Sequence, residues 1–268
     1  MSPRLDSALA ARGMARSRTH AAGLISSGLV SVDGKAVVKA AHVVTDEAVI
    51  VVAGADHYVS RAAHKLIAGL DAFGIEVSGR VALDMGASTG GFTQVLRERG
   101  AEPVVAVDVG HGQLADEIAA DPGVIPVEGF NVRALTPDTL AEAAGRTVSP
   151  EIVTGDLSFI SLTHVLPAVR SVAGPRTDVV LLVKPQFEVG RTAVKGGLVT
   201  SPGLRADAVA GVLWSAWDAG LGTHGVTSSP LPGTHGNQEY LVHLRAREGD
   251  AGNPTEWIRT VDRLAGAR

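Results

Sequence analysis

Residues 81–92 contain the stretch that decides the fold: Val81-Ala82-Leu83-Asp84-Met85-Gly86-Ala87-Ser88-Thr89-Gly90-Gly91-Phe92. Its apolar start predicts a buried strand, the glycines predict a turn, and the residues after them predict the beginning of a helix. A strand that passes through a glycine-rich turn into a helix is a common opening unit of α/β sheets. Glycines let a ligand approach the backbone closely, and free amides at a helix start can hold polar or anionic groups.

The alternation of helices and strands continues along the chain. A helix is predicted at 61–73, and short apolar strands at 81–84, 104–108, 124–127, 152–155 and 179–183. This order predicts an α/β fold, with a mostly parallel, Rossmann-like sheet covered by helices on both faces. Segments 222–227 and 240–245 have no helix between them, so an antiparallel pair is expected there, before a last helix at 254–264.

The first 54 residues have a different pattern, which predicts a small separate α+β domain. A short helix is expected at 4–12, and Ser17 can cap the start of a second helix. Asp33-Gly34 is a strong signal for a two-residue hairpin between short strands. We therefore divide the chain into a domain at 1–54, a linker at 55–59 and a larger α/β domain at 60–268.

Charge is distributed unevenly between the two parts. The 268-residue chain has a net charge of −4, which argues against a protein that coats nucleic acid with its whole surface. Residues 1–42 nevertheless carry a net charge of +4, and the rest carries −8. The asymmetry predicts that the basic part meets a polyanion, although a solvated helix face remains the alternative. The basic residues are Arg4, Arg12, Arg16, Arg18, Lys35 and Lys39.

Composition excludes several classes of function. The sequence has no cysteine, which removes disulfides, thiolate metal sites and cysteine nucleophiles from consideration. No apolar run reaches the roughly 18–20 residues that span a bilayer, and the N-terminus is too polar for a signal peptide. A cytoplasmic protein without stable membrane insertion is the expectation.

Two strand ends predict a nucleoside-cofactor site. Asp84 is expected at the end of the first strand of the sheet, and Asp108 at the end of the next, where a carboxylate can accept both hydroxyls of a ribose. The spacing G-x-x-x-G-G differs from the dinucleotide pattern G-x-G-x-x-G. An acidic residue just before the glycines suits the positively charged amino-acid end of S-adenosylmethionine better than a pyrophosphate. The alternative is a tight turn whose glycines only permit packing.

Polar residues also follow two later strands. Asp156 comes directly after 152–155, and Lys184 after 179–183. Lysine is rarely buried unless it is paired or functional, and burial can bring its pKa near neutrality. Lys65 and Glu239 complete a set of four candidate catalytic residues. For such residues taken singly, a structural ion-pair network is the alternative.

Several motifs resemble known families. Arg4-Leu5-Asp6, Ala15-Arg16-Ser17-Arg18 and the segment 28–35 resemble the S4-type RNA-binding domain. Four further segments, in order along the chain, resemble the TlyA family of haemolysin-annotated, FtsJ-like methyltransferases: Val59-Ser60-Arg61-Ala62-Ala63-His64-Lys65-Leu66, residues 84–93, Asp156-Leu157-Ser158-Phe159-Ile160-Ser161-Leu162 and Val183-Lys184-Pro185-Gln186-Phe187-Glu188. The interdomain segment departs from the family pattern, because Tyr58 stands where relatives have a tryptophan-containing stretch.

The resemblance implies S-adenosylmethionine-dependent 2′-O-methylation of cytidine in 16S or 23S ribosomal RNA, with 30S, 50S or 70S particles as partners. It implies a catalytic tetrad of Lys65, Asp156, Lys184 and Glu239 without a metal. It places the cofactor on Asp84, Gly86, Ala87, Ser88, Gly90, Gly91 and Asp108. Asn131 is expected on the adenine side, with a turn residue as the alternative. The basic residues of 1–42 are expected to contact RNA.

Three rival functions remain open. A methyltransferase for a small molecule or a protein would leave the basic N-terminal domain without a role. A membrane-active haemolysin would have to lyse cells without a cofactor. A non-catalytic RNA-binding factor would bind RNA tightly without transferring a methyl group. The sequence does not predict an oligomeric state.

Overall fold

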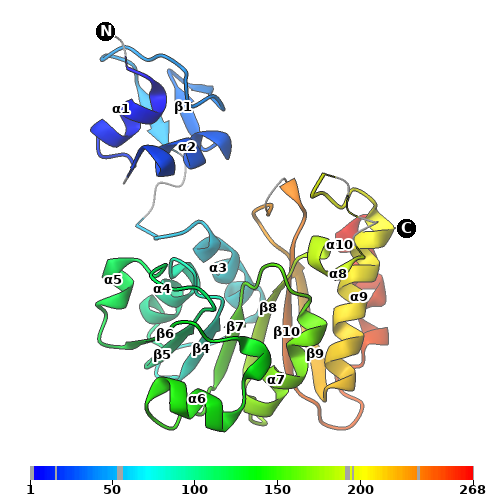
Figure 1. The fold of residues 1–268 in the computed structure, drawn as a ribbon. Helices are drawn as coiled ribbons and strands as arrows, with labels where there is room; N and C mark the ends of the chain where they lie inside the picture. Colours follow the sequence, from blue (N-terminus) through cyan, green and yellow to red (C-terminus); the bar gives the residue numbers. More distant parts are fainter. Residues whose placement is uncertain are drawn as a thin grey trace. The chain divides into compact units, whose positions relative to one another are not determined.

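The computed structural model describes residues 3–15, 17–52, 57–190, 194, 196–233 and 236–267 (Figure 1). The chain divides into two compact units, residues 1–57 and 58–268. Arg16 and the linker residues Ala55 and Asp56, which were singled out in the sequence, lie outside the described residues.

The N-terminal unit packs two helices on a small sheet. Its elements are α1 (Leu5–Ala11), α2 (Arg18–Ser26), β1 (Val30–Val32), β2 (Lys35–Ala36) and β3 (Ile50–Val52), with strand order β2-β1-β3. Ser17 accepts a hydrogen bond from the amide of His20 and caps α2, as its sequence position predicts. Asp33 and Gly34 both have positive φ, at 49° and 77°, which agrees with the predicted tight hairpin. Leu5, Leu9 and Ile25 are fully buried between the helices and the sheet.

The larger unit is built on a seven-stranded sheet. Its strands are β4 (Ala82–Met85), β5 (Val104–Val107), β6 (Val124–Val127), β7 (Ile152–Gly155), β8 (Asp178–Val183), β9 (Leu221–Ser228) and β10 (Tyr240–Ala246). In the described residues the strand order is β6-β5-β4-β7-β8-β10-β9. Strands β4 to β8 are parallel, and β10 is antiparallel to both of its neighbours, which confirms the predicted mixed sheet.

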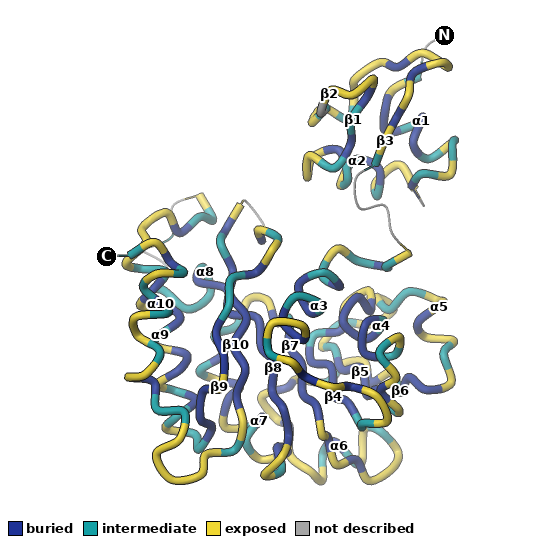
Figure 2. Tube along the Cα trace, turned by 180° about the vertical axis from the view of Figure 1, so that it is seen from behind, coloured by how far each residue is buried: buried dark blue, intermediate teal, exposed yellow. Residues whose placement is uncertain are grey.

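Helices cover both faces of this sheet. They are α3 (Ala62–Phe73), α4 (Gly91–Glu98), α5 (Asp116–Ala119), α6 (Pro137–Ala144), α7 (Leu166–Val172), α8 (Pro185–Glu188), α9 (Pro202–Asp218) and α10 (Ile258–Ala265), with 3-10 turns η1 (Val132–Ala134), η2 (Leu162–His164) and η5 (Pro254–Glu256). The single helix expected at 254–264 is thus divided into η5 and α10. Figures 1 and 2 show the sheet from opposite sides, with α7 and α9 nearer in the first view and α3 and α4 nearer in the second.

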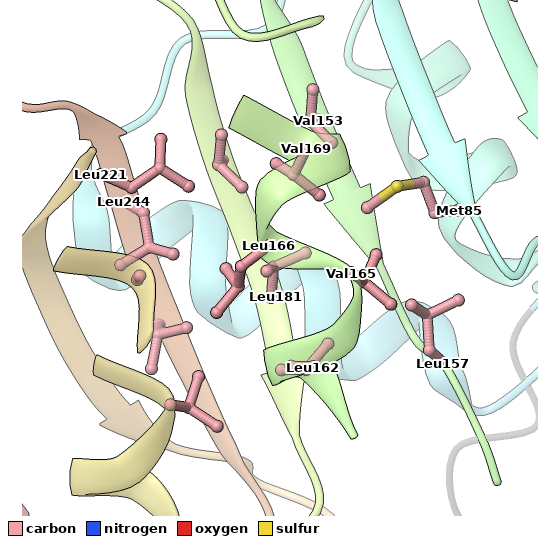
Figure 3. Packing of buried hydrophobic residues seen from close by; sticks show 14 of the residues in the cluster. Met85, Val153, Leu157, Leu162, Val165, Leu166, Val169, Leu181, Leu221 and Leu244 are labelled. Carbon is pink, nitrogen blue, oxygen red and sulfur yellow. The ribbon is translucent and has the colours of Figure 1, made fainter. Parts of the chain in front are cut away.

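The strands are apolar on both faces, which explains their continuous hydrophobic runs. Val179, Leu181 and Val183 join one core cluster with α6, α7, α9 and α10, part of which Figure 3 shows. Val180 and Leu182 point to the other face and pack with α3 and α4. Each fully buried leucine of this kind contributes about 1.5–3 kcal/mol to stability. Burial on both faces leaves the strand ends as the places where polar side chains reach solvent (Figure 2).

Candidate functional site

Three of the four candidate catalytic residues meet at one edge of the sheet because of its topology. Asp156 follows β7 and Lys184 follows β8, so both lie at the carboxyl ends of parallel strands. Strand β10 runs the other way, and its first residue, Tyr240, pairs with Val183, the last residue of β8. Glu239 therefore enters the same edge one residue before β10 begins.

The four residues form two close ion pairs. Lys184 Nζ lies 2.5 Å from Asp156 Oδ1 and donates a hydrogen bond of 2.8 Å to Ser158 Oγ. Lys65, carried by α3, lies with its Nζ 2.6 Å from Glu239 Oε2. Lys65, Lys184 and Glu239 are 5 %, 8 % and 2 % exposed, so each pair has lost most of its hydration. Buried ion pairs are weak contributors to stability because desolvation offsets their attraction, which favours a functional reason for keeping two of them side by side.

The glycine loop between β4 and α4 is tightly packed. Gly86 and Gly90 have φ of 78° and 98°, values that other residues rarely adopt. A Cβ added at Gly86 would lie 3.0 Å from Leu157 Cδ2 and 3.1 Å from the carbonyl oxygen of Asp156. The loop thus approaches the segment that carries Asp156 as closely as backbone permits. Glycine is required here by close approach as well as by φ.

A cavity of about 150 Å³ opens between this loop and the catalytic edge. Its lining comes from the start of α3, the glycine loop, the loop after β7, and the end of β8. The lining residues are Ser60, Ala62, Gly86, Ala87, Ser88, Thr89, Gly91, Phe92, Asp156, Ser158 and Lys184. Lys65 and Glu239 do not line this cavity, so their pair lies beside it rather than in it.

A second cavity shares Ala87 and Ser88 with the first and continues toward β5 and β6. Asp108 lines it, and its two carboxylate oxygens accept hydrogen bonds from the amides of Ser88 (2.8 Å) and Gly110 (2.7 Å). Leu114, Pro126 and Val127 supply apolar walls. A carboxylate held beside apolar walls fits a ribose joined to a base, so the residues present suit the nucleoside part of S-adenosylmethionine.

Asp84 lies away from both cavities, contrary to the expectation that it contacts the cofactor's amino group. It is completely buried, and it accepts hydrogen bonds from the hydroxyls of Thr93 (2.7 Å) and Thr154 (3.0 Å). Burial raises the pKa of Asp84 to about 6, and the two threonine hydrogen bonds oppose that rise. Strand β4 continues one residue further than predicted, to Met85, and Asp84 therefore stays within the sheet. It joins β4, α4 and β7 beneath the glycine loop.

Asn131 is likewise occupied by local structure. Its side chain accepts a hydrogen bond from the amide of Arg133 and caps η1, which agrees with its reading as a turn residue. Glu128 lines the second cavity instead and accepts a hydrogen bond of 2.7 Å from the amide of Gly112. Sequence reasoning missed Glu128, although it directly follows β6 just as Asp108 follows β5.

Ser60 and Ser158 are also cavity residues that sequence reasoning did not select. Ser158 lies two positions after Asp156, in the motif at 156–162. Nothing about a serine in a sequence indicates that it contacts a lysine. Ser60 lies so close to the loop that a Cβ on Gly91 would come within 2.8 Å of its own Cβ. Only the packing of α3 against the glycine loop identifies it.

The basic residues of the N-terminal unit differ in their contacts. Arg12 donates hydrogen bonds to the carbonyl oxygens of residues 45, 46 and 48, which hold its side chain against that segment. Arg4 and Arg18 each pair with Asp6 at 3.1 Å and remain more than half exposed. Burial alone would raise the pKa of Asp6, but these two arginines outweigh it and the pKa is lowered. Lys35 and Lys39 are exposed.

The described residues offer neither a metal centre nor a membrane-spanning helix. They hold no group of three or more histidine, cysteine, aspartate or glutamate side chains arranged to bind a metal ion. Among them, no helix has the length and apolar character needed to cross a membrane.

Comparison with known proteins identifies two matching domain families and relatives that cover most of the chain. The model of the FtsJ-like methyltransferase family matches residues 58–246, and that of the S4 domain matches residues 3–50. The chain is 51 % identical over 247 residues to the 16S/23S rRNA (cytidine-2′-O)-methyltransferase TlyA of Mycobacterium tuberculosis, covering 91 % of this chain and 90 % of that one. It is 37 % identical to Hemolysin A of Brachyspira hyodysenteriae, over 90 % and 99 % of the two chains.

A solved structure named as a candidate hemolysin, from Streptococcus thermophilus, is similar over both units. Its TM-score is 0.77 at 33 % identity, with 99 % of this chain and 96 % of that chain covered.

Proposed function

The chain belongs to the TlyA family of FtsJ-like, S-adenosylmethionine-dependent methyltransferases, and from that premise we propose that it methylates the 2′-hydroxyl of cytidine in ribosomal RNA. The observation that carries this proposal is the place of Lys184. Its Nζ lines the cavity beside the glycine loop and contacts both Asp156 and Ser158. A cation at this point faces the space in which a hydroxyl oxygen would meet a methyl donor.

The two cavities would hold different parts of the cofactor. When bound, the cofactor supplies a methyl group on a positively charged sulfur. Asp108 would take the ribose hydroxyls, and Leu114 and Val127 would contact the base. Ser88 and the loop glycines would hold the amino-acid end. Carboxylates at both ends of the site suit a ligand that carries positive charge.

Lys184 and Asp156 act together on the attacking hydroxyl. A ribose 2′-hydroxyl is a weak acid, so the developing negative charge on its oxygen must be stabilised as the new O–C bond forms. The methyl carbon's bond to sulfur would break in the same step, and its electron pair would leave with sulfur as a neutral thioether. Lys184 Nζ, held 2.5 Å from Asp156 Oδ1, donates a hydrogen bond to the attacking 2′-oxygen. The hydroxyl proton passes to the carboxylate of Asp156, because Lys184 acts here as the hydrogen-bond donor. Much of the remaining acceleration comes from alignment of the reacting atoms.

Lys65 and Glu239 form the second half of the tetrad. Their pair is more deeply buried than Lys184 and adjoins it across the β8–β10 register. We assign Lys65 to anchoring the target nucleotide and Glu239 to orienting that lysine. Breaking a buried pair by removing one partner leaves an uncompensated charge, so both residues are needed for the site to keep its shape.

Residues 1–54 form the RNA-binding module and residues 60–268 the catalytic one, with 55–59 as the link. The phosphates of the RNA are bound by Arg4, Arg18, Lys35 and Lys39. Arg16 is proposed to bind them as well, from its sequence position. Such contacts position an RNA without reading its bases. The RNA lies in 16S or 23S ribosomal RNA, presented by a 30S, 50S or 70S particle, which places the enzyme in the cytoplasm.

The deciding experiment is transfer of a tritiated methyl group from S-adenosylmethionine to purified 30S, 50S and 70S particles. The wild-type protein is expected to label at least one of them, in 2′-O-methylcytidine. Lys184→Ala should lower the rate by about 10²–10⁴-fold, the usual effect of removing a group that handles a proton. Arg146→Ala, an exposed change after α6, serves as the matched control and should leave the rate unchanged.

Each rival function predicts a different result. A non-catalytic factor would bind the particles and label none of them, and a haemolysin would lyse cells without cofactor. An enzyme for a small molecule or protein would be as active without residues 1–57. Full labelling by Lys184→Ala would reject the role assigned to that lysine.

A further inference from the structure

Lys184 receives both of its polar contacts from one loop. This loop runs from Asp156, at the end of β7, to Leu162, where η2 begins. We call residues 156–162 the β7 loop. Asp156 and Ser158 lie in its first half and contact Lys184 Nζ at 2.5 Å and 2.8 Å. The placement of Lys184 therefore depends on the conformation of a seven-residue segment outside any strand.

The β7 loop holds a conformation that it does not favour by itself. Phe159 has φ of 65°, in the left-handed region that is costly for any residue except glycine. A residue held there costs about 1–3 kcal/mol and persists only when its surroundings enforce the conformation. Phe159 is 92 % exposed, so burial of its own side chain supplies little of that energy.

The enforcing contacts come from α8, the short helix that begins directly after Lys184. The rings of Phe159 and Phe187 pack with their centroids 5.4 Å apart. One position later, Glu188 accepts two hydrogen bonds from the far end of the β7 loop: Oε2 from the Ser161 hydroxyl at 2.6 Å, and Oε1 from the Leu162 amide at 3.0 Å. The two segments are thus joined at both ends, through Lys184 at one and Glu188 at the other.

The hydrogen bonds that Glu188 accepts from the β7 loop offset part of the cost of burying its carboxylate. Glu188 is half-buried, and burial raises its pKa, while the hydrogen bonds from Leu162 and Ser161 and the nearby His164 act in the opposite direction. The β7 loop therefore supplies hydrogen bonds that stabilise the charged form of the Glu188 carboxylate, and Glu188 supplies acceptors that anchor the loop.

We propose that Glu188 is a positioning residue for methyl transfer, which fixes the β7 loop on α8 so that Asp156 and Ser158 remain on Lys184. The role of Lys184 in catalysis rests on the proposed function, but the mechanical link between Glu188 and Lys184 does not. Glu188 itself lines neither cavity described above.

Two substitutions of Glu188 distinguish its role in anchoring the β7 loop from any effect of its negative charge. Glu188→Ala removes both acceptors. Glu188→Gln keeps two hydrogen bonds and reverses one of them, because its carbonyl can accept from Leu162 while its amide donates to Ser161 Oγ. Ser161 can then turn its own proton to Thr163 Oγ1, which already lies 2.7 Å away.

In the methyl-transfer assay, Glu188→Ala is expected to lower kcat about 10–100-fold, as a misplaced catalytic group does, with KM for both substrates within threefold of wild type. Glu188→Gln should restore kcat to within threefold. Glu142→Ala, an exposed glutamate on α6, is the matched control and should behave as wild type. A wild-type kcat in Glu188→Ala, or equal losses in the Ala and Gln variants, would overturn the proposal.

A second readout needs no RNA and no methyl transfer. The chain has five lysines, so [ε-¹³C]lysine labelling gives a spectrum in which Lys184 can be assigned by its loss in Lys184→Arg. In Glu188→Ala, the Lys184 resonance should move toward those of exposed Lys35 and Lys39, while in Glu188→Gln it should stay in place. An unchanged Lys184 resonance in folded Glu188→Ala would contradict the link whatever the enzyme's substrate.

Should Glu188→Ala fail to fold, Ser161→Ala replaces it in both assays, because it removes one of the two hydrogen bonds at smaller cost. It should give a smaller shift in the same direction, and no shift would overturn the proposal. Absence of methyl transfer by wild type, with the Lys184 shift present, would instead reject the proposed function alone.

Discussion

At the scale of single residues, Asp84 shows how position within a strand decides what a carboxylate does. It lies one residue before the end of β4, wholly buried, with Thr93 and Thr154 as its donors. A carboxyl group with two neutral donors and no cation is costly to ionise in such a place. Asp84 therefore couples the stability of the fold to pH, while Asp108, past the end of its strand, faces a cavity.

The sign of this coupling can be predicted. The folded-state pKa of Asp84, about 6, is above the ordinary value of 3.8, so the folded protein binds this proton more tightly than the unfolded chain does. The stability from Asp84 is complete below pH 3.8 and is lost as pH rises through 6, by roughly 3 kcal/mol in all at about 1.4 kcal/mol per pKa unit. Asp84→Asn removes this loss.

The test is urea unfolding of both proteins between pH 4 and pH 7. Relative to wild type, Asp84→Asn should gain stability as pH rises. The comparison between the two proteins cancels Asp6 and Asp121, whose lowered pKa values make stability rise with pH in both. A stability difference that is independent of pH would show that Asp84 is ionised throughout.

At the scale of elements, the glycine loop is shaped by what packs around it. Gly90 has φ of 98°, and a Cβ there would lie 3.0 Å from Leu114 Cδ1 and from Ile118 Cγ2. These two side chains belong to the segment that closes the second cavity and to α5. The loop, the cavity wall and the start of α4 thus pack against one another, and a methyl group at Gly90 disturbs all three.

Gly90→Ala is accordingly expected to weaken S-adenosylmethionine binding about tenfold or more, since left-handed backbone costs an alanine roughly 1–2 kcal/mol before any clash is counted. Isothermal titration calorimetry with the cofactor measures this directly. Gly211→Ala is the control, because Gly211 lies exposed in α9 with open space around it. It should leave binding unchanged and stabilise the protein by about 0.5–1 kcal/mol. Equal affinities in the two variants would mean that the loop does not contact the cofactor.

At the scale of the whole molecule, a small basic unit is joined to a larger acidic one. Residues 1–42 carry a net charge of +4, and the rest of the chain carries −8. Arg12 donates hydrogen bonds to three backbone carbonyls, which fix its side chain but leave its positive charge in place. An RNA would bind the basic unit with a strong dependence on salt, while the acidic unit keeps non-specific binding weak.

This division predicts the effect of salt on RNA affinity. The double variant Lys35→Ala/Lys39→Ala should reduce the slope of log K against log salt concentration by roughly 1–2, because each lost phosphate contact contributes about 0.7–0.9. Filter binding to ribosomal RNA from 50 to 300 mM KCl measures the slope. Arg146→Ala, on the acidic unit, should leave it unaltered, and an unaltered slope in the lysine variant would remove both lysines from the RNA interface.

The sequence alone predicted the two-part organisation, the order of strands and helices, the antiparallel C-terminal pair and the edge at which the chemistry gathers. These features follow from local signals: apolar periodicity, the Ser17 cap, the Asp33-Gly34 turn and the glycine loop all act over a few residues. The candidates Asp156 and Lys184 could be identified because each directly follows a buried strand, and the carboxyl ends of parallel strands are where ligand-binding side chains gather.

Only the tertiary structure decided which strand-end side chains face the cavities and which partners they take. Asp84 turned inward because β4 continued by one residue, and Glu128 rather than Asn131 lines the second cavity. Lys65 meets Glu239 across 174 residues of sequence, and Ser158 meets Lys184 across 26. Local pattern determines where an element begins and ends, but the direction of a side chain at its end depends on packing between segments far apart in the chain.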